Sequence, residues 1–338
     1  MRYSRAVQGW LWVGVIMVFI QILLGGITRL TGSGLSITKW EIVTGTLPPM
    51  DADSWATEFD AYKETPQYEK INAGMDLSSF KFIYFWEYFH RLWARILGFV
   101  FLIPFVIFLA RGKLDADINK KLLLAVFFGG VVGLFGWIMV ASGLVDRPWV
   151  NAYKLMLHLG LAVLLFCFMV YVTVDYRQRA HNSWKPSVLT KKKLWTLTIV
   201  VFIQILLGAL MSGMKAGLFF PTWPSMNGTY WPEVLRQAEN WNWGAFKEYD
   251  SNTFVPAIVQ ILHRGTAYGL FIAYAIYAFR FSDNKMRIAF GILCLQVILG
   301  VWTLISCIGQ VPLVLGSLHQ LVGIMFLGYM ILLLSLRK

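Results

Sequence analysis

Apolar residues along this chain gather in long segments that polar stretches separate. Eight such segments occur, at roughly 8–28, 82–110, 121–141, 153–174, 194–213, 256–280, 286–306 and 313–336. A helix needs about 20 predominantly apolar residues to cross the hydrocarbon core of a bilayer. The pattern therefore predicts an all-α integral membrane protein with eight transmembrane helices.

The first segment lies where a signal peptide would lie, but it does not end as a signal peptide ends. Beginning near Gln8, it runs directly into Gly-Gly-Ile-Thr-Arg, without a cleavage site of small residues. We therefore interpret it as a true transmembrane helix. No Arg- and Ser-rich leader precedes it, so we expect a bacterial inner (cytoplasmic) membrane as the location.

Composition and charge support this interpretation. Hydrophobic residues make up 57% of the 338 positions and charged residues 14%, and the net charge is +12. Basic residues collect near the N-terminus and in the alternate connections 111–121, 177–193, 280–287 and 337–338. Because Lys and Arg favour the cytoplasmic side, both termini are expected to be cytoplasmic. This asymmetry explains the basic excess without a nucleic-acid partner, and the large apolar fraction requires membrane lipid around the protein.

The chain also contains an internal duplication. The eight residues 18–25 recur unchanged at 201–208, and the same offset aligns Pro49 with Pro232 in the following polar stretches. Further along, the His90-Arg91 pair corresponds to His263-Arg264, and His158 corresponds to His319. We therefore predict two halves, 1–185 and 186–338.

Each predicted half contains four helices, so both halves have the same orientation in the membrane. A pseudo-twofold axis along the membrane normal is expected to relate them. Short connections favour a four-helix bundle in each half. The two long connections, 29–81 and 214–255, are expected to form caps on the outer surface.

Four of the five histidines fall at equivalent positions of these bundles. His90, His158, His263 and His319 each lie a few residues into an even-numbered segment, whereas His181 lies in a polar connection and is interpreted as surface. All four intramembrane imidazoles should therefore lie at a similar depth near the outer face. Ionisable side chains in a membrane are candidates for function.

Two imidazoles per bundle suit the iron of a haem, which takes its protein ligands from facing helices. Zinc is a weaker alternative, because it usually requires more ligands close by. Hydrogen bonding of each histidine between helices is the purely structural alternative.

Two arginines and one glutamate adjoin these histidines. Arg91 and Arg264 could pair with haem propionates or extend to the lipid headgroups. Glu87 lies on the helix face of His90, but its counterpart in the second half is Gln260. The asymmetry indicates that the halves have different tasks. A structural ion pair of Glu87 with Arg91 or Arg95 is the alternative.

Several of these motifs resemble the haem A synthase family. The resemblance rests on TRLTGSGLS at 28–36, EYFHR at 87–91, GWIMV at 136–140, His263-Arg264 and His319-Gln320. The chain lacks the cysteine pair of some bacterial members and is similar to the cysteine-free branch shared by Gram-negative bacteria and mitochondria. Val132 and Ala141 stand where the resemblance leads us to expect Gln and Lys.

The resemblance implies an enzyme that oxidises the C8 methyl of haem O to a formyl group, giving haem A for terminal oxidases. It implies a haem b cofactor held by His263 and His319, with Arg264, in the second half. The substrate haem O would bind His90 and His158, with Arg91, in the first half, and Glu87 would be the catalytic residue.

The resemblance also implies an electron donor, which the sequence does not identify. Association with haem O synthase and formation of a homo-oligomer are left open. The rival function is a di-haem b-type electron-transfer cytochrome, which explains the four histidines but not Glu87. A haem transporter would need polar residues in the cytoplasmic half of the helices, and a prenyltransferase would need Asp-rich motifs.

Overall fold

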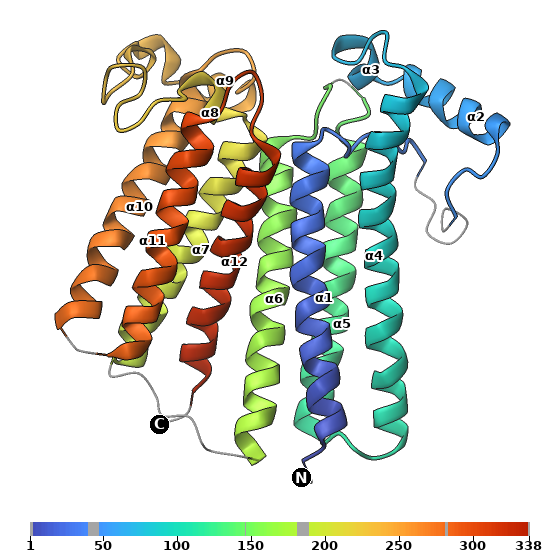
Figure 1. The fold of residues 1–338 in the computed structure, drawn as a ribbon, viewed down its shortest axis with the longest axis vertical. Coiled ribbons are helices and arrows are strands. Elements are labelled where there is room, and N and C mark those ends of the chain that lie inside the picture. Colours follow the sequence, from blue (N-terminus) through green and yellow to red (C-terminus); the bar gives the residue numbers. More distant parts are fainter. Residues whose placement is uncertain (1–2, 40–46, 146, 181–188, 281–282, 337–338) are drawn as a thin grey trace. The chain divides into compact units, whose positions relative to one another are not determined.

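The computed structural model describes residues 3–39, 47–145, 147–180, 189–280 and 283–336. Within these ranges the long elements are all helices (Figure 1): α1 Arg5–Leu30, α4 Leu77–Ala110, α5 Ala116–Ala141, α6 Ala152–Ala180, α7 Lys191–Gly213, α10 Phe254–Arg280, α11 Asn284–Ile305 and α12 Leu313–Ser335. The predicted all-α class is confirmed. His181 and the predicted boundary near Lys185 lie outside the described residues.

The chain divides into two units, Met1–Tyr176 and Arg177–Lys338. The long helices of the first unit are α1, α4 and α5 together with most of α6. In the second unit α7 packs against α10 and α12, and α11 packs against the same two helices. The second unit is thus a closed ring of four helices, while the predicted pseudo-twofold axis stays a prediction.

Seven of the long helices in the described part of the chain are long and apolar enough to cross a membrane. The protein is therefore a multi-pass membrane protein. The eighth predicted span corresponds to α10, which is helical but does not reach that apolarity. Its Gln260, His263 and Arg264 lower its mean hydropathy, so this span stays a prediction.

Local sequence explains where several of these helices begin. The side chains of Ser4, Asp76, Asp115, Thr190 and Asp283 each accept a backbone N–H bond at the start of a long helix. Such caps satisfy backbone donors that have no partner inside the helix. The cap at Asp76 starts α4 at Leu77, five residues before the apolar segment begins.

Polar side chains join α1 to α4 along most of their length. Trp10 donates to the Val100 carbonyl at 3.1 Å, and near the middle Trp93 donates to the Met17 carbonyl at 3.0 Å. Thr28 Oγ1 donates to the Trp86 carbonyl at 3.2 Å near the other end. These bonds fix the register of the two antiparallel helices, because a sliding helix would lose all of them.

The two long connections contain the short helices. The first holds α2 Ala52–Lys63 and α3 Pro66–Lys70, and the second holds α8 Ala216–Phe219, η2 Glu233–Leu235, η3 Ala238–Asn240 and α9 Trp243–Lys247. In each unit they lie at one end of its own bundle (Figure 1). Phe59 and Tyr62 of α2 pack on Phe80 of α4, with ring centroids 4.9 and 5.1 Å away. This aromatic cluster attaches the first cap to its bundle.

The cap of α4 predicts a pH-dependent stability. Hydrogen bonds from Ser79, and then Ser78, lower the pKa of Asp76 below 3.8. A lowered folded-state pKa gives stability that is complete above the unfolded value and is lost as the pH falls through the folded value. Hydrogen exchange in the first turn of α4 should therefore accelerate below about pH 4 relative to Asp76→Asn, whose amide keeps a cap that does not titrate. Equal pH dependence in both proteins would refute this assignment.

Candidate functional site

Each intramembrane histidine lies against a glycine of another helix of its own unit. A methyl group built on that glycine would meet the Cε1 atom of the ring at 2.7–3.4 Å, and the pairs are Gly25–His90 at 3.1 Å, Gly136–His158 at 3.0 Å, Gly208–His263 at 3.4 Å and Gly300–His319 at 2.7 Å. At Gly25, Gly136 and Gly300 an added methyl would force the ring to shift, whereas at Gly208 it would make an ordinary contact. The glycines therefore set where each imidazole can lie.

The two imidazoles of the second unit face each other. The ring centroids of His263 and His319 are 6.5 Å apart, and the ring planes are 73° from parallel. A metal–imidazole bond of about 2.1 Å, with a ring centroid roughly 1.1 Å behind its nitrogen, separates two rings on opposite sides of one metal by roughly 6.4 Å. This spacing would allow His263 and His319 to hold one haem iron between them.

Backbone carbonyls orient two of the four rings. His319 Nδ1 lies 3.1 Å from the Gln296 carbonyl, and His158 Nδ1 lies 3.1 Å from the Val132 carbonyl. A carbonyl only accepts, so Nδ1 carries the proton in both rings and Nε2 keeps its lone pair. This tautomer is the one that metal-ligating histidines commonly adopt.

The other two rings lie beside glutamines. Gln21 Nε2 lies 3.2 and 3.3 Å from the ring nitrogens of His90 and donates to the His90 carbonyl at 3.2 Å. Gln204 Nε2 donates to the His263 carbonyl at 2.9 Å. Within the described residues, His263 Nδ1 is buried without a hydrogen-bond partner. Burying a polar atom without a hydrogen bond costs free energy in an apolar interior. The His263 ring is therefore suited to bind a ligand or to form one more hydrogen bond.

Glu87 is buried, with 3% of its surface exposed, and both carboxylate oxygens are bonded. Oε2 accepts from Ser36 N at 2.7 Å, Ser36 Oγ at 2.8 Å and Ile37 N at 2.9 Å. Oε1 pairs with Arg91 Nη2 at 2.5 Å. The ion pair weighed as the structural alternative is therefore present, and the carboxylate also holds the start of the first cap.

Gln260 is fully buried and holds the equivalent part of the second unit differently. Its Nε2 donates to the Phe220 carbonyl at 2.8 Å. Phe220 corresponds to Ile37 at the duplication offset. Glu87 thus accepts from backbone N–H groups where Gln260 donates to a backbone carbonyl, so only the first unit has a negative charge at this position.

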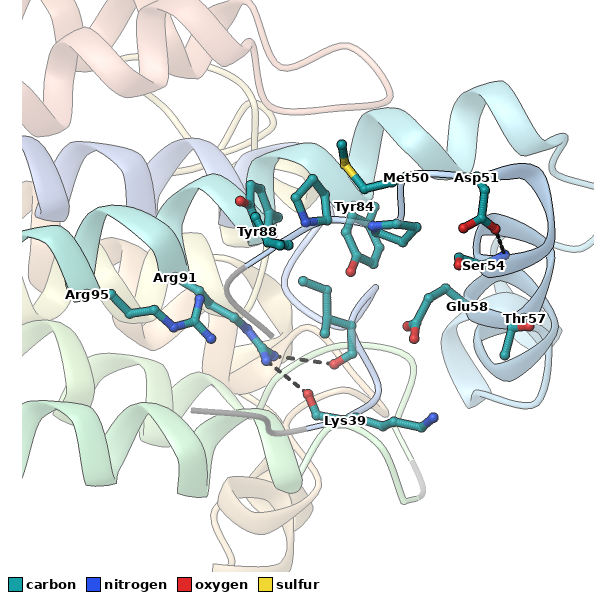
Figure 2. Close-up of a pocket in the computed structure, with 14 residues that line it drawn as sticks. Lys39, Met50, Asp51, Ser54, Thr57, Glu58, Tyr84, Tyr88, Arg91 and Arg95 are labelled. Carbon is teal, nitrogen blue, oxygen red and sulfur yellow. Dashed lines mark hydrogen bonds between the residues drawn. The ribbon is translucent and has the colours of Figure 1, made fainter. Parts of the chain in front are cut away.

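Arg91 and Arg264 both donate to backbone carbonyls of their own caps. Arg91 donates to Ile37 at 3.3 Å and Lys39 at 3.2 Å (Figure 2), and Arg264 donates to Phe220 at 3.4 Å and Thr222 at 2.6 Å. These acceptors are equivalent in the two halves. Each arginine therefore attaches a cap to its helix, and contacts of either with propionates stay a prediction.

A cavity of about 400 Å³ opens between α4 and the first cap. Figure 2 shows Tyr84, Tyr88, Arg91 and Arg95 lining one side from α4, with Glu58 of α2 opposite them. None of the four intramembrane histidines belongs to its lining. The cavity therefore adjoins the cap-facing side of Arg91.

The glutamines beside the histidines were not predicted from the sequence. In three helix pairs a glutamine stands four residues before the glycine that contacts the histidine: Gln21, Gln204 and Gln296. The signal was visible as QILLG at 21–25 and 204–208 and QVILG at 296–300. In the fourth pair the equivalent segment, 132–136, begins with Val132. The repeating element is thus a pair of helices, half the size of the predicted duplication.

Fold and site together define a class of protein. It is a helical membrane protein in which four half-buried imidazoles each lie against a glycine, and two of them, His263 and His319, are spaced to hold one metal ion. Residues 8–331 match the cytochrome oxidase assembly protein family COX15-CtaA. The chain belongs to this family, whose curated members include proteins named haem A synthase.

Similarity to these relatives extends over nearly the whole chain. The haem A synthase of Bradyrhizobium diazoefficiens is 40% identical over 95% of this chain and 88% of its own. That of Caulobacter sp. is 40% identical over 94% and 92%, and that of Flavobacterium psychrophilum is 37% identical over 97% of each. The family resemblance noted in the sequence is confirmed.

Adding a methyl group at Gly300 should displace His319. The new Cβ would lie 2.7 Å from its Cε1 and 3.3 Å from its Nδ1, and moving the ring would break its bond to the Gln296 carbonyl. We expect Gly300→Ala to lose most haem from the purified protein, by pigment extraction. Gly208→Ala is the matched control, because its methyl would meet His263 at 3.4 Å, an ordinary contact. Alanine favours helix over glycine by about 1 kcal/mol at either position, so a change in helix propensity would not explain haem loss. Equal haem loss in both variants would therefore contradict the steric argument.

Proposed function

We propose that this protein converts haem O to haem A by oxidising the C8 methyl of the porphyrin to a formyl group. The proposal rests on family membership and on one observation, the imidazole pair His263 and His319, whose spacing fits haem iron. The first unit repeats the glycine-supported histidines in His90 and His158. An enzyme that holds one haem as cofactor and another as substrate needs two such sites.

The second unit binds the cofactor, haem b, through His263 and His319. When bound, haem b supplies one-electron redox chemistry. Arg264 keeps a buried Nε with no hydrogen bond inside the described ranges. This donor is available to a haem carboxylate while the rest of the guanidinium holds the cap, so Arg264 can serve both purposes.

The first unit binds the substrate, haem O, through His90 and His158, and Arg91 has the position equivalent to Arg264. Glu87 lies on the helix face of His90. Its hydrogen bonds from Ser36 and Ile37 hold the carboxylate in one place before the substrate reacts. A fixed negative charge in an apolar site stabilises positive charge that develops during methyl oxidation. The Ser36 hydroxyl donates to Oε2 at 2.8 Å and helps to hold the carboxylate in this position.

The protein lies in the bacterial inner membrane with both termini in the cytoplasm. The distribution of basic residues supports this orientation. The four histidines lie in the halves of α4, α6, α10 and α12 nearest the caps, which would then face the periplasm. The haems would bind near that surface, where an electron donor and the terminal-oxidase assembly machinery can approach.

The rival electron-transfer cytochrome is favoured by one observation, the complete hydrogen bonding of Glu87. A purely structural carboxylate would also be bonded in this way. Pigment extraction with mass analysis distinguishes the two, because only the synthase yields formyl haem in a strain that makes haem O.

Replacing Glu87 separates its charge from its structural role. We expect Glu87→Ala to lower haem A formation by about 10²–10³-fold, the effect of losing one electrostatic stabiliser, while haem b stays bound. Glu87→Gln can still accept the backbone N–H bonds but is neutral, so its activity should fall similarly. Glu64→Ala, which removes an exposed carboxylate of the first cap, is the control. Wild-type haem A yield from Glu87→Gln would rule out the charge-based role.

A further inference from the structure

The repeated glutamine beside each histidine suggests a role that the histidines alone do not explain. Gln21, Gln204 and Gln296 each precede a histidine-contacting glycine by one helical turn, so glutamine and glycine share a face of their helix. Their Oε1 atoms are all buried without a hydrogen bond among the described residues. Three equivalent unpaired acceptors at one type of position indicate a shared function.

In the second unit a matching donor is present. His263 Nδ1 is buried and unpaired in the described structure, and Gln204 is already joined to the same residue through the His263 carbonyl. Gln296 Nε2 likewise lies 3.4 Å from His319 Nε2. Gln21 and Gln296 therefore contact the imidazole itself, whereas Gln204 contacts the backbone of its histidine.

The fourth helix pair lacks this amide. Val132 stands at the equivalent position, and its backbone carbonyl is the recorded hydrogen-bond partner of His158. His319, the counterpart of His158, has both the Gln296 carbonyl and the Gln296 side chain. The surroundings of the two histidines thus differ by one polar side chain. It is missing beside His158, in the unit that binds substrate under the proposed function.

We propose that Gln21, Gln204 and Gln296 are positioning residues that orient the neighbouring imidazoles for haem ligation, and that Val132 leaves His158 less restrained than its counterpart His319. The inference rests on the proposed function, because it takes these imidazoles as haem ligands. Groups that orient a ligating histidine typically change metal affinity 10–100-fold. His158 should therefore hold haem in the first unit less tightly than His319 holds haem in the second.

Reciprocal substitutions test this inference in the full-length protein. Gln296→Val should speed transfer of haem b to apomyoglobin by about 10–100-fold. Val132→Gln should slow transfer of haem O by a similar factor. Low-spin electron paramagnetic resonance of each haem should shift as well, because the signal depends on imidazole orientation. Loss of stability alone would not produce such a shift in the haem that remains bound.

Gln8→Val is the matched control. Gln8 is a buried glutamine of α1 whose Nε2 donates to the Thr173 carbonyl, and it contacts neither His90 nor His158 in any recorded bond. Wild-type transfer rates and resonance are expected for this variant. Wild-type behaviour of Gln296→Val and Val132→Gln, or equal changes in Gln8→Val, would overturn the inference.

The inference and the proposed function fail in different ways. Haem A formation by the wild type with unchanged haem transfer in both variants would refute the positioning role alone. Changed transfer and resonance without any haem A in a strain making haem O would refute the synthase and keep the positioning role. If His319→Ala kept haem b with an unchanged spectrum, the ligand assignment beneath both would be wrong.

Discussion

The structure depends on placing polar imidazoles between closely packed apolar helices. Burying an imidazole without a partner costs free energy, and at three of the four histidines, His90, His158 and His319, a close approach between helices supplies a partner for the ring. Glycine allows that approach at each of the four histidines. At His158 and His319 it also brings Nδ1 within 3.1 Å of a backbone carbonyl one turn before the glycine. One steric condition thus sets both the position and the protonation of these rings.

The caps depend on a second set of buried polar contacts. Arg91 and Arg264 hold equivalent carbonyls in the two units, whereas Glu87 and Gln260 hold opposite kinds of backbone group. Duplication has therefore kept the attachment of each cap and changed the charge beneath it. The helix register does not depend on the residue at this position, because other contacts maintain it. The charge could therefore change in one unit alone, as two unlike haem sites under the proposed function would need.

The repeat of a glutamine or valine four residues before each glycine relates the four helix pairs. The exact repeat at 18–25 and 201–208 draws attention to the halves and obscures the weaker similarity within each half. The segments QVILG and VGLFG do not stand out in the sequence, because apolar helices resemble one another in composition. Contact with a histidine is what distinguishes these positions from their neighbours.

Sequence alone determined the helical membrane class, the duplication and the four candidate histidines, because hydrophobic length and repeated motifs are properties of local sequence. It also indicated that Glu87 differs from Gln260. Only the tertiary structure decided what these side chains contact. Ser36 and Glu87 are 51 residues apart, and Val132 and His158 are 26 apart, so their hydrogen bonds depend on how helices and loops pack. That packing gives His158 and His319 their tautomer and gives Glu87 its fixed place.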